Sequence, residues 1–505
     1  MTRTRSTRPT ASAAPRPVAD NPVADNPVAD NPVADNPVAD NPVADNPVAG
    51  DPVTDDPVTD DPVVQETIEH LQALIRLDSS NPPGNELAVA RYLDGVLRAA
   101  GIDTWLDEPT PERGALIARI RGDGTERPLL LMAHMDVVGV EPDKWTYPPF
   151  GAEVHGGFLY GRGAIDDKGM LACHLVTMLL VRRAIASTGR LPTRDIVLVA
   201  TADEEAGGIY GIDWVMEHRK DLIDAEFALN EGGRVRIVGA RTLYAAVQCA
   251  EKVPHNVIVT ARGPGGHASV PHAGNAITRL VGAVARIAAH QEPLALSEVT
   301  RTFFRELSAI WPDAPLRQAM ADVASGDPAR VSEGARALSH VPSMDAVLRN
   351  GISPTLISGG TRSNVIPTEA EATLNIRTLP GVPIDAVLER LRAVVDDPHV
   401  TMRVRASGDD APESAIDSPM FRAVADAAIS LEAGIVTVPY LSTGATDSAT
   451  LRKAGIACYG ILPFPLTQED EDRMHGHDER VGIDALGFGV RLVHGIVTRM
   501  TGLSA

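Results

Sequence analysis

Three short apolar segments, each followed at once by acidic or histidine side chains, constrain the fold of this chain most. They read PLLLMAHMDVV (128–138), DIVLVATADEE (195–205) and AEFALNEGG (225–233). Continuous apolar runs of this length are typical of strands buried on both faces, and helical stretches such as GMLACHLVTMLLVRRAI (169–185) separate them. The alternation predicts an α/β domain built on a largely parallel mixed sheet flanked by helices.

A second pattern begins near His255. A strand, a helix, two strands, a helix and a strand follow, at 255–263, 276–290, 353–360, 369–379, 384–395 and 400–406. This is the order of a ferredoxin-like α+β unit. We therefore expect an inserted ferredoxin-like domain at 252–406, between two parts of the α/β domain at 63–251 and 407–505. The stretch 296–350 is mostly helical in pattern and is interpreted as an insertion.

Residues 1–62 form a region of different composition. They repeat Asn-Pro-Val-Ala-Asp, which degenerates into Asp-Pro-Val-Thr-Asp. A proline every fifth residue is incompatible with a helix, and one valine per repeat offers too little apolar surface to offset the entropy of ordering. The repeat therefore predicts a disordered Pro/Asp-rich tail.

Charge and hydropathy exclude several partners. The formal net charge is -21, and no Lys/Arg cluster could neutralise a run of phosphates, so we expect no nucleic-acid partner. No apolar run approaches the ~18 to 20 residues that span a bilayer, and the N-terminus lacks an apolar core of the kind that signal peptides carry. We expect no membrane association and a cytoplasmic protein.

Most of the chemistry-bearing residues follow the predicted strands, whereas Asp166 and His475 lie in loop motifs. Because the carboxyl ends of strands in an open α/β sheet meet at one edge, these side chains should converge there. Histidines mixed with carboxylates suit zinc, with cobalt or manganese as alternatives, better than calcium or magnesium. Asp166 is the natural bridge between two ions, and the pair Glu204–Glu205 offers two carboxylates, one for a metal and one for a water. The set is His134, Asp136, Asp166, Glu204, Glu205, Glu231 and His475.

These residues stand in motifs that resemble a known family. AHMDVV, GRGAIDDKG, TADEEAGG, NEGG, GGHASVPHAGNAI, TGATDS and HGHDERV occur in its order. The family is that of the dizinc aminoacylases and carboxypeptidases, which includes succinyl-diaminopimelate desuccinylase and glutamate carboxypeptidase. The block 145–169 and the insertion look closest to carboxypeptidase S-like members. The resemblance covers about 64–505.

The resemblance implies a role for each metal-site residue. His134, Asp166 and Glu231 would bind one Zn²⁺, and Asp166, Glu205 and His475 the other. Glu204 would be the general base. Asp136 would hydrogen-bond the far nitrogen of His134. The peptide bond between Asp166 and Asp167 would be cis.

The inserted domain would act as a lid and dimerisation domain. By the same resemblance, His267 would stabilise the oxyanion in a partner subunit's site, which favours a homodimer. Arg377 would bind the free carboxylate of the substrate, and Asn364, Gly444 and Thr446 would contact the substrate.

The expected function is metal-dependent hydrolysis of the amide bond of a small peptide or N-acyl amino acid that bears a free carboxylate. A deacetylase or desuccinylase of amino-acid metabolism is an alternative. A bimetallic hydrolase that is not a peptidase, such as a phosphoesterase, and a catalytically inactive binding protein are rival interpretations. Loss of Glu204 or of a ligand would indicate the inactive protein, but all are present.

Overall fold

The computed structural model describes residues 59–503. Apart from residues 59–62, the predicted disordered tail at 1–62 lies outside the described residues. The first helix, α1 (Pro62–Ile75), begins where the side chain of Asp61 accepts hydrogen bonds from the amides of Val63 and Val64. Such a carboxylate cap satisfies amides at the start of the helix that have no partner within it.

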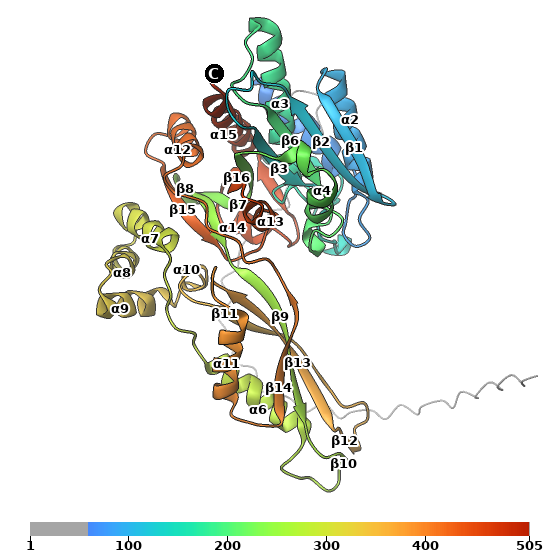
Figure 1. Ribbon diagram of the computed structural model, residues 1–505, viewed down its shortest axis with the longest axis vertical. Helices are drawn as coiled ribbons and strands as arrows, with labels where there is room; N and C mark the ends of the chain where they lie inside the picture. The colour runs from blue at the N-terminus through green and yellow to red at the C-terminus, as the bar shows by residue number, and fades with distance from the viewer. Residues whose placement is uncertain (1–58, 504–505) are drawn as a thin grey trace, which may run out of the picture. The chain divides into compact units, whose positions relative to one another are not determined.

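An eight-stranded mixed sheet forms the centre of the first domain (Figure 1). Its strands lie in the order β1-β2-β6-β3-β7-β16-β8-β15, and the pairs β3/β6, β3/β7, β7/β16 and β8/β15 are parallel. The predicted largely parallel mixed sheet is therefore confirmed. The strands are β1 (Asp103–Thr110), β2 (Arg113–Ile120), β3 (Leu129–His134), β6 (Ile196–Thr201), β7 (Phe227–Val238), β8 (Arg241–Glu251), β15 (Val436–Ser442) and β16 (Ala457–Leu466). A small sheet beside it contains β4 (Glu153–His155), β5 (Phe158–Tyr160) and β17 (Arg480–Gly482).

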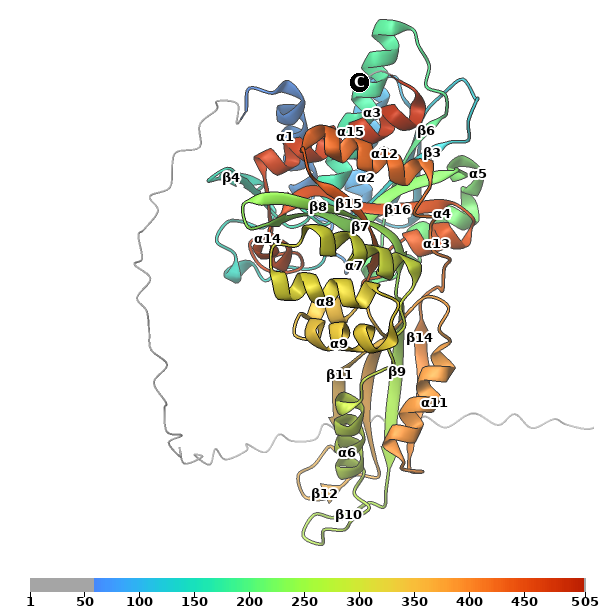
Figure 2. The same ribbon diagram turned by 90° about the vertical axis from the view of Figure 1, so that its left-hand side faces the viewer.

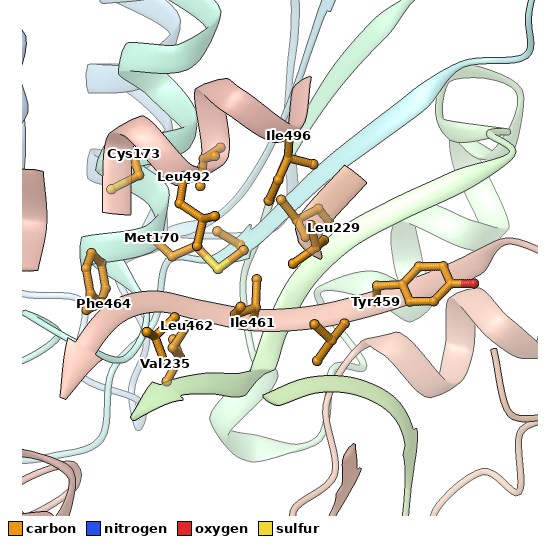
Figure 3. Close-up of a cluster of buried hydrophobic side chains, with 14 of the residues drawn as sticks. Met170, Cys173, Leu229, Val235, Tyr459, Ile461, Leu462, Phe464, Leu492 and Ile496 are labelled. Atoms are coloured by element: carbon orange, nitrogen blue, oxygen red, sulfur yellow. The ribbon is translucent and has the colours of Figure 1, made fainter. Parts of the chain in front are cut away.

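Helices cover both faces of this sheet. Leu129 and Leu131 of β3 belong to one buried cluster, whereas Leu130 and Met132 belong to another on the opposite face. Figure 3 shows part of the first cluster, in which side chains of α3 and α15 meet those of β7 and β16. Burial on both faces explains why the strands are continuously apolar. The helices are α2 (Glu86–Ala99), α3 (Lys168–Thr188), α4 (Ile212–His218), α5 (Lys220–Ile223), α12 (Pro419–Leu431), α13 (Ser448–Lys453), α14 (Gln468–Asp472) and α15 (Ile483–Thr501).

The second domain, called the lid below, is an antiparallel four-stranded sheet in the order β11-β13-β9-β14 (Figure 2). Alternate residues of β13 are buried against two helices, as expected for a sheet with one covered face. Strand order and helix placement are those of the predicted ferredoxin-like unit. Its elements are β9 (Val253–Arg262), α6 (Ala276–Ala289), β11 (Gly351–Gly359), β13 (Glu369–Thr378), α11 (Ile384–Val395) and β14 (Val400–Ser407), with a small pair β10 (Gly266–His267) and β12 (Val365–Ile366).

The stretch 296–350 is helical as predicted, but its packing differs from the assignment of 252–406 to one domain. Its helices are α7 (Glu298–Ile310), α8 (Ala314–Ala324), α9 (Pro328–Leu338) and α10 (Pro342–Asp345). Phe303 and Phe304 are buried in the core of the first domain, and the Phe303 ring lies 5.6 Å from that of Tyr440 in β15. An amphipathic pattern predicts an apolar face but not the surface that covers it.

Helix α3 corrects one statement from the sequence. By length and by the composition of an 18-residue window, it is apolar enough to cross a membrane. However, 67% of that window is buried inside the protein. Its apolar side chains therefore pack in the core of the first domain, which accounts for its composition.

Candidate dinuclear metal site

Strands of the eight-stranded sheet place the candidate residues at one edge. His134 is the last residue of β3, and Glu204 and Glu205 form the short 3-10 turn that follows β6. Glu231 lies within β7, which pairs in parallel with β3. Because these strands are neighbours with the same direction, their polar residues converge, as predicted.

Asp166 lies at the centre of this group. Its Oδ1 is 3.0 Å from Nε2 of His134, and its Oδ2 is 3.1 Å from Nε2 of His475. His475 also lies 3.1 Å from Oε1 of Glu205. The loops that carry Asp166 and His475 are thus brought together although they are 309 residues apart. The peptide bond between Asp166 and Asp167 is cis, as the resemblance implied.

Two overlapping groups of side chains could each hold a metal ion. His134, Asp166 and Glu205 have ligand atoms within 4.8 Å of one another, and so do His134, Glu204 and Glu231. The second group contains Glu204, which the resemblance makes the base rather than a ligand. By its position, Glu204 could act either as a metal ligand or as the general base.

The electrostatics of these groups fit bound cations. Burial raises the pKa of Glu231 well above its usual value, and the charges of Asp166 and Glu204 raise it further. Burial also raises the pKa of Glu204, with contributions from Asp447 and Glu205. Carboxylates held this close repel one another unless protons or metal ions neutralise them. Histidine and carboxylate donors in this number suit a pair of divalent ions of the zinc type.

The two histidines compensate part of this charge. Burial would lower the pKa of His134, but its contacts with Asp136 and Asp166 raise it well above the usual value. Hydrogen bonds to Asp166 and Glu205 raise the pKa of His475 to about 10. Since metal binding requires neutral imidazole, ions and protons compete for this site.

Asp136 has a broader role than the resemblance implied. Its carboxylate Oδ1 lies 3.5 Å from Nδ1 of His134, whereas its backbone oxygen lies only 2.9 Å from the same nitrogen. The shorter distance makes the backbone oxygen the better acceptor. The carboxylate instead accepts hydrogen bonds of 3.1 Å from the backbone amides of both Glu204 and Glu205.

The lid residues lie apart from this group. His267 is exposed in β10 and is not among the residues that gather around Asp166. Asn364 is beside it, because its backbone oxygen accepts from the amide of Ala268 and His267 pairs with Val365. Figures 1 and 2 place β10 and β12 at the end of the lid sheet farther from the eight-stranded sheet.

Arg377 lies on β13, opposite Gly351 of β11. Its Nε donates to Asn375, and its Nη1 is buried without a hydrogen-bond partner among residues 59–503. Burial lowers its pKa. A cation in this state is suited to an anionic ligand, since a buried donor without a partner is costly.

The loop after β15 carries Gly444 and Thr446. The Thr446 hydroxyl donates to Glu251 over 2.9 Å, and the Gly444 amide donates to Ser442 over 3.1 Å. Thr446 and Glu204 line one pocket of about 280 Å³. A substrate in this pocket would contact both of these residues.

Sequence reasoning missed two supporting carboxylates. Glu479 accepts hydrogen bonds from the amides of Gly163, Ile165 and Asp166, and so holds the loop of the central aspartate. Asp447 is buried and accepts from Thr201 over 3.0 Å, and burial raises its pKa to about 7. Both stand in the quoted motifs HGHDERV and TGATDS, but their partners are backbone atoms or distant residues that the sequence does not indicate.

A family model, curated relatives and a solved structure all relate this chain to the same peptidase family. Residues 130–499 match the model of peptidase family M20/M25/M40. The N-fatty-acyl-amino acid synthase/hydrolase PM20D1 of Xenopus tropicalis is 30% identical over 365 residues, 71% of this chain and 70% of that protein. The probable carboxypeptidase S-like 2 of Dictyostelium discoideum is 29% identical over 72% of this chain and 69% of its own length. The crystal structure of the M20 family metallo-carboxypeptidase Sso-CP2 from Sulfolobus solfataricus has a TM-score of 0.64 at 17% identity, over 87% of this chain and 100% of that one.

Proposed function

The chain belongs to peptidase family M20/M25/M40 and is a metallohydrolase, and we propose that it hydrolyses the amide bond of a small peptide or N-acyl amino acid that carries a free carboxylate. Two metal ions per site are typical of this family. We propose two Zn²⁺ ions here, for which Co²⁺ or Mn²⁺ could substitute. His134, Asp166 and Glu231 would hold one ion, and Asp166, Glu205 and His475 the other.

One observation carries this proposal. The two carboxylate oxygens of Asp166 face different histidines, His134 at 3.0 Å and His475 at 3.1 Å. A carboxylate in this position can bridge two cations, each with its own imidazole. The side chains around it are donors of the types that zinc accepts.

The proposed mechanism combines the geometry of the metal group with the roles that the resemblance implies for the other residues. Bound divalent ions would polarise the amide carbonyl and lower the pKa of a water molecule toward ~7. Glu204 accepts the proton of that water and returns it to the leaving amine. Arg377 binds the substrate carboxylate, and Asn364, Gly444 and Thr446 contact the substrate. His267 donates to the developing oxyanion, a contribution that can be worth ~3 kcal/mol.

We also propose a homodimer, in which His267 acts in the site of the partner subunit. The exposed position of His267 at the end of the lid supports this, since the residue has no neighbour from the metal group. The edge strand β11 exposes Leu356 and Ile357 by 66% and 62%, and α6 exposes Val281 by 52%. An apolar edge of this kind is suited to pairing with a second copy. Helix α7 packs against β15 of the first domain, α8 packs on α7 and α9 packs on α8, so this group of helices is directed toward the first domain.

A second candidate substrate class comes from the PM20D1 relatives, whose name refers to N-fatty-acyl amino acids. The pocket beside Glu204 favours short substrates instead, because its volume is only about 280 Å³; its lining combines polar residues such as Glu251 and Thr446 with apolar ones such as Ile212 and Pro254. Turnover of dipeptides and of N-acyl amino acids of increasing acyl length distinguishes the two classes. The zinc-loaded protein should prefer dipeptides or short acyl groups.

The test of the mechanism is Glu204→Gln. The amide keeps the shape of the side chain but cannot accept a proton, so kcat should fall about 10²- to 10⁴-fold. Metal analysis should still find two ions per subunit. Loss of an ion would place Glu204 among the ligands, as the group with His134 and Glu231 allows. Unchanged kcat would contradict its role as base.

A further inference from the structure

The backbone of Glu204 and Glu205 is held from outside the metal site. Asp203 precedes them in a left-handed conformation, with φ of 68°. Aspartate tolerates this region better than most residues, but it still needs support from its surroundings. The turn directs the amides of Glu204 and Glu205 at the two carboxylate oxygens of Asp136, each over 3.1 Å. The orientation of both glutamates therefore depends on Asp203 and Asp136.

Asn81 connects these two aspartates. Its side-chain amide nitrogen donates to Oδ2 of Asp136 over 2.8 Å and to Oδ1 of Asp203 over 3.1 Å. Asn81 is only 8% exposed, and its own backbone amide donates to Val137 over 2.9 Å. One buried amide group thus donates its two protons to two carboxylates and reduces their mutual repulsion.

Arg113 holds Asp203 from the other side. Its Nη2 donates to Oδ1 of Asp203 over 2.6 Å, and its Nε lies 2.8 Å from Glu86. The Arg113 side chain is 8% exposed and that of Glu86 is fully buried. The guanidinium packs so closely on Gly84 that a β-carbon there would lie 2.4 Å from it. Because the guanidinium is buried and closely packed, it is fixed in the orientation in which it donates to Asp203.

We propose that Asn81 and Arg113 are positioning residues for the Glu204–Glu205 pair. They act through Asp136 and Asp203, and they direct Glu205 toward His475 and Asp166 while Glu204 faces His134 and Glu231. Adjacent residues then perform different tasks, one as ligand and one as base, because the peptide unit between them cannot rotate. The roles of ligand and base rest on the proposed function. The hydrogen bonds that fix the two glutamates do not depend on it.

The test is Asn81→Ala, measured first by titration of the metal-free protein with Co²⁺. Loss of a residue that orients a ligand costs about 10- to 100-fold in metal affinity or activity. We expect one of two binding events to weaken about tenfold. At saturating Co²⁺, kcat should fall about tenfold while KM changes less than about threefold. Arg113→Lys should act in the same direction, because lysine keeps the charge but cannot span Glu86 and Asp203.

Gln72→Ala is the matched control. Gln72 also uses an amide to connect distant segments, donating to the backbone oxygen of Ala152 over 2.9 Å, but it lies outside the candidate site. It should change Co²⁺ affinity and kcat less than about twofold. Wild-type Co²⁺ binding and kcat in Asn81→Ala would overturn the proposal. Equal losses in Asn81→Ala and Gln72→Ala would overturn it as well, since they would reflect general destabilisation. If the wild-type protein hydrolyses no amide, the proposed function fails, while a weakened Co²⁺ event in Asn81→Ala still supports the positioning.

Discussion

The edge of the eight-stranded sheet and the tip of the lid carry candidate active-site residues in opposite environments. At the sheet edge, His134, Asp166 and Glu231 are buried and contacted from several segments. At the tip, His267 and Asn364 are exposed, and their described contacts come from neighbouring lid residues. The first region is preorganised by its own fold. The second offers a donor whose target must come from lid movement or another subunit.

This difference separates two kinds of dependence. Residues at the sheet edge should determine metal content and the chemical step in each subunit alone. Residues at the lid tip should leave metal content unchanged and affect only turnover.

Asp166→Ala should remove both metal ions, because one carboxylate faces both histidines and would neutralise both ions. Activity should fall below detection, and metal analysis after dialysis should find less than one ion per subunit. Asp484→Ala, an exposed aspartate in the first turn of α15, is the control and should retain both ions. Full metal occupancy in Asp166→Ala would contradict the bridging role.

The position of this site could be predicted from sequence, whereas its support could not. His134, Glu204 and Glu231 follow or lie in apolar strands, so the topology of a parallel sheet is enough to bring them together. The supporting contacts come from Asn81, which donates to Asp136 and Asp203, and from Glu479, which accepts from the loop of Asp166; these partners lie 55 to 122 and 313 to 316 residues away. No periodicity encodes such pairs. The packing of α7 on β15 was missed for the same reason, since the pattern shows an apolar face without its partner.

His267→Ala should lower kcat about 100-fold and leave both metal ions bound, because it removes an oxyanion donor but no ligand. Mixing this variant with Glu204→Gln tests whether the residue acts between subunits. A mixed dimer contains one site with both wild-type residues, so random exchange should restore about a quarter of wild-type activity. If proven subunit exchange restores nothing, His267 acts within its own subunit.

The pH dependence of metal stabilisation tests the sheet edge alone. His475 has its pKa raised to about 10 and that of His134 is also raised, so in the metal-free protein both contribute stability below the unfolded-state value of about 6.5. That contribution is lost as pH rises toward 10. Burial raises the pKa of Glu231 as well, so this carboxyl also makes the metal-free protein less stable as pH rises. The difference in Tm between zinc-loaded and metal-free protein should therefore grow from pH 6.5 to pH 9. A constant difference would mean that protons and ions do not compete there.

Ser269→Ala should have the smallest effect and tests how the lid tip orients its histidine. Nδ1 of His267 lies 3.1 Å from the backbone amide of Ser269 and 2.7 Å from its hydroxyl. Because the backbone amide can only donate, Nδ1 must accept, and the proton of the neutral ring then lies on Nε2, where it can serve an oxyanion. The substitution removes the hydroxyl but keeps the amide, so the tautomer persists while the ring gains freedom. We expect kcat to fall about two- to fivefold with KM and metal content unchanged, and the effect should vanish when His267 is already alanine. An equal loss in the His267→Ala background would show that Ser269 acts directly on the substrate or the fold. The lid tip would then affect turnover by a route other than the orientation of His267.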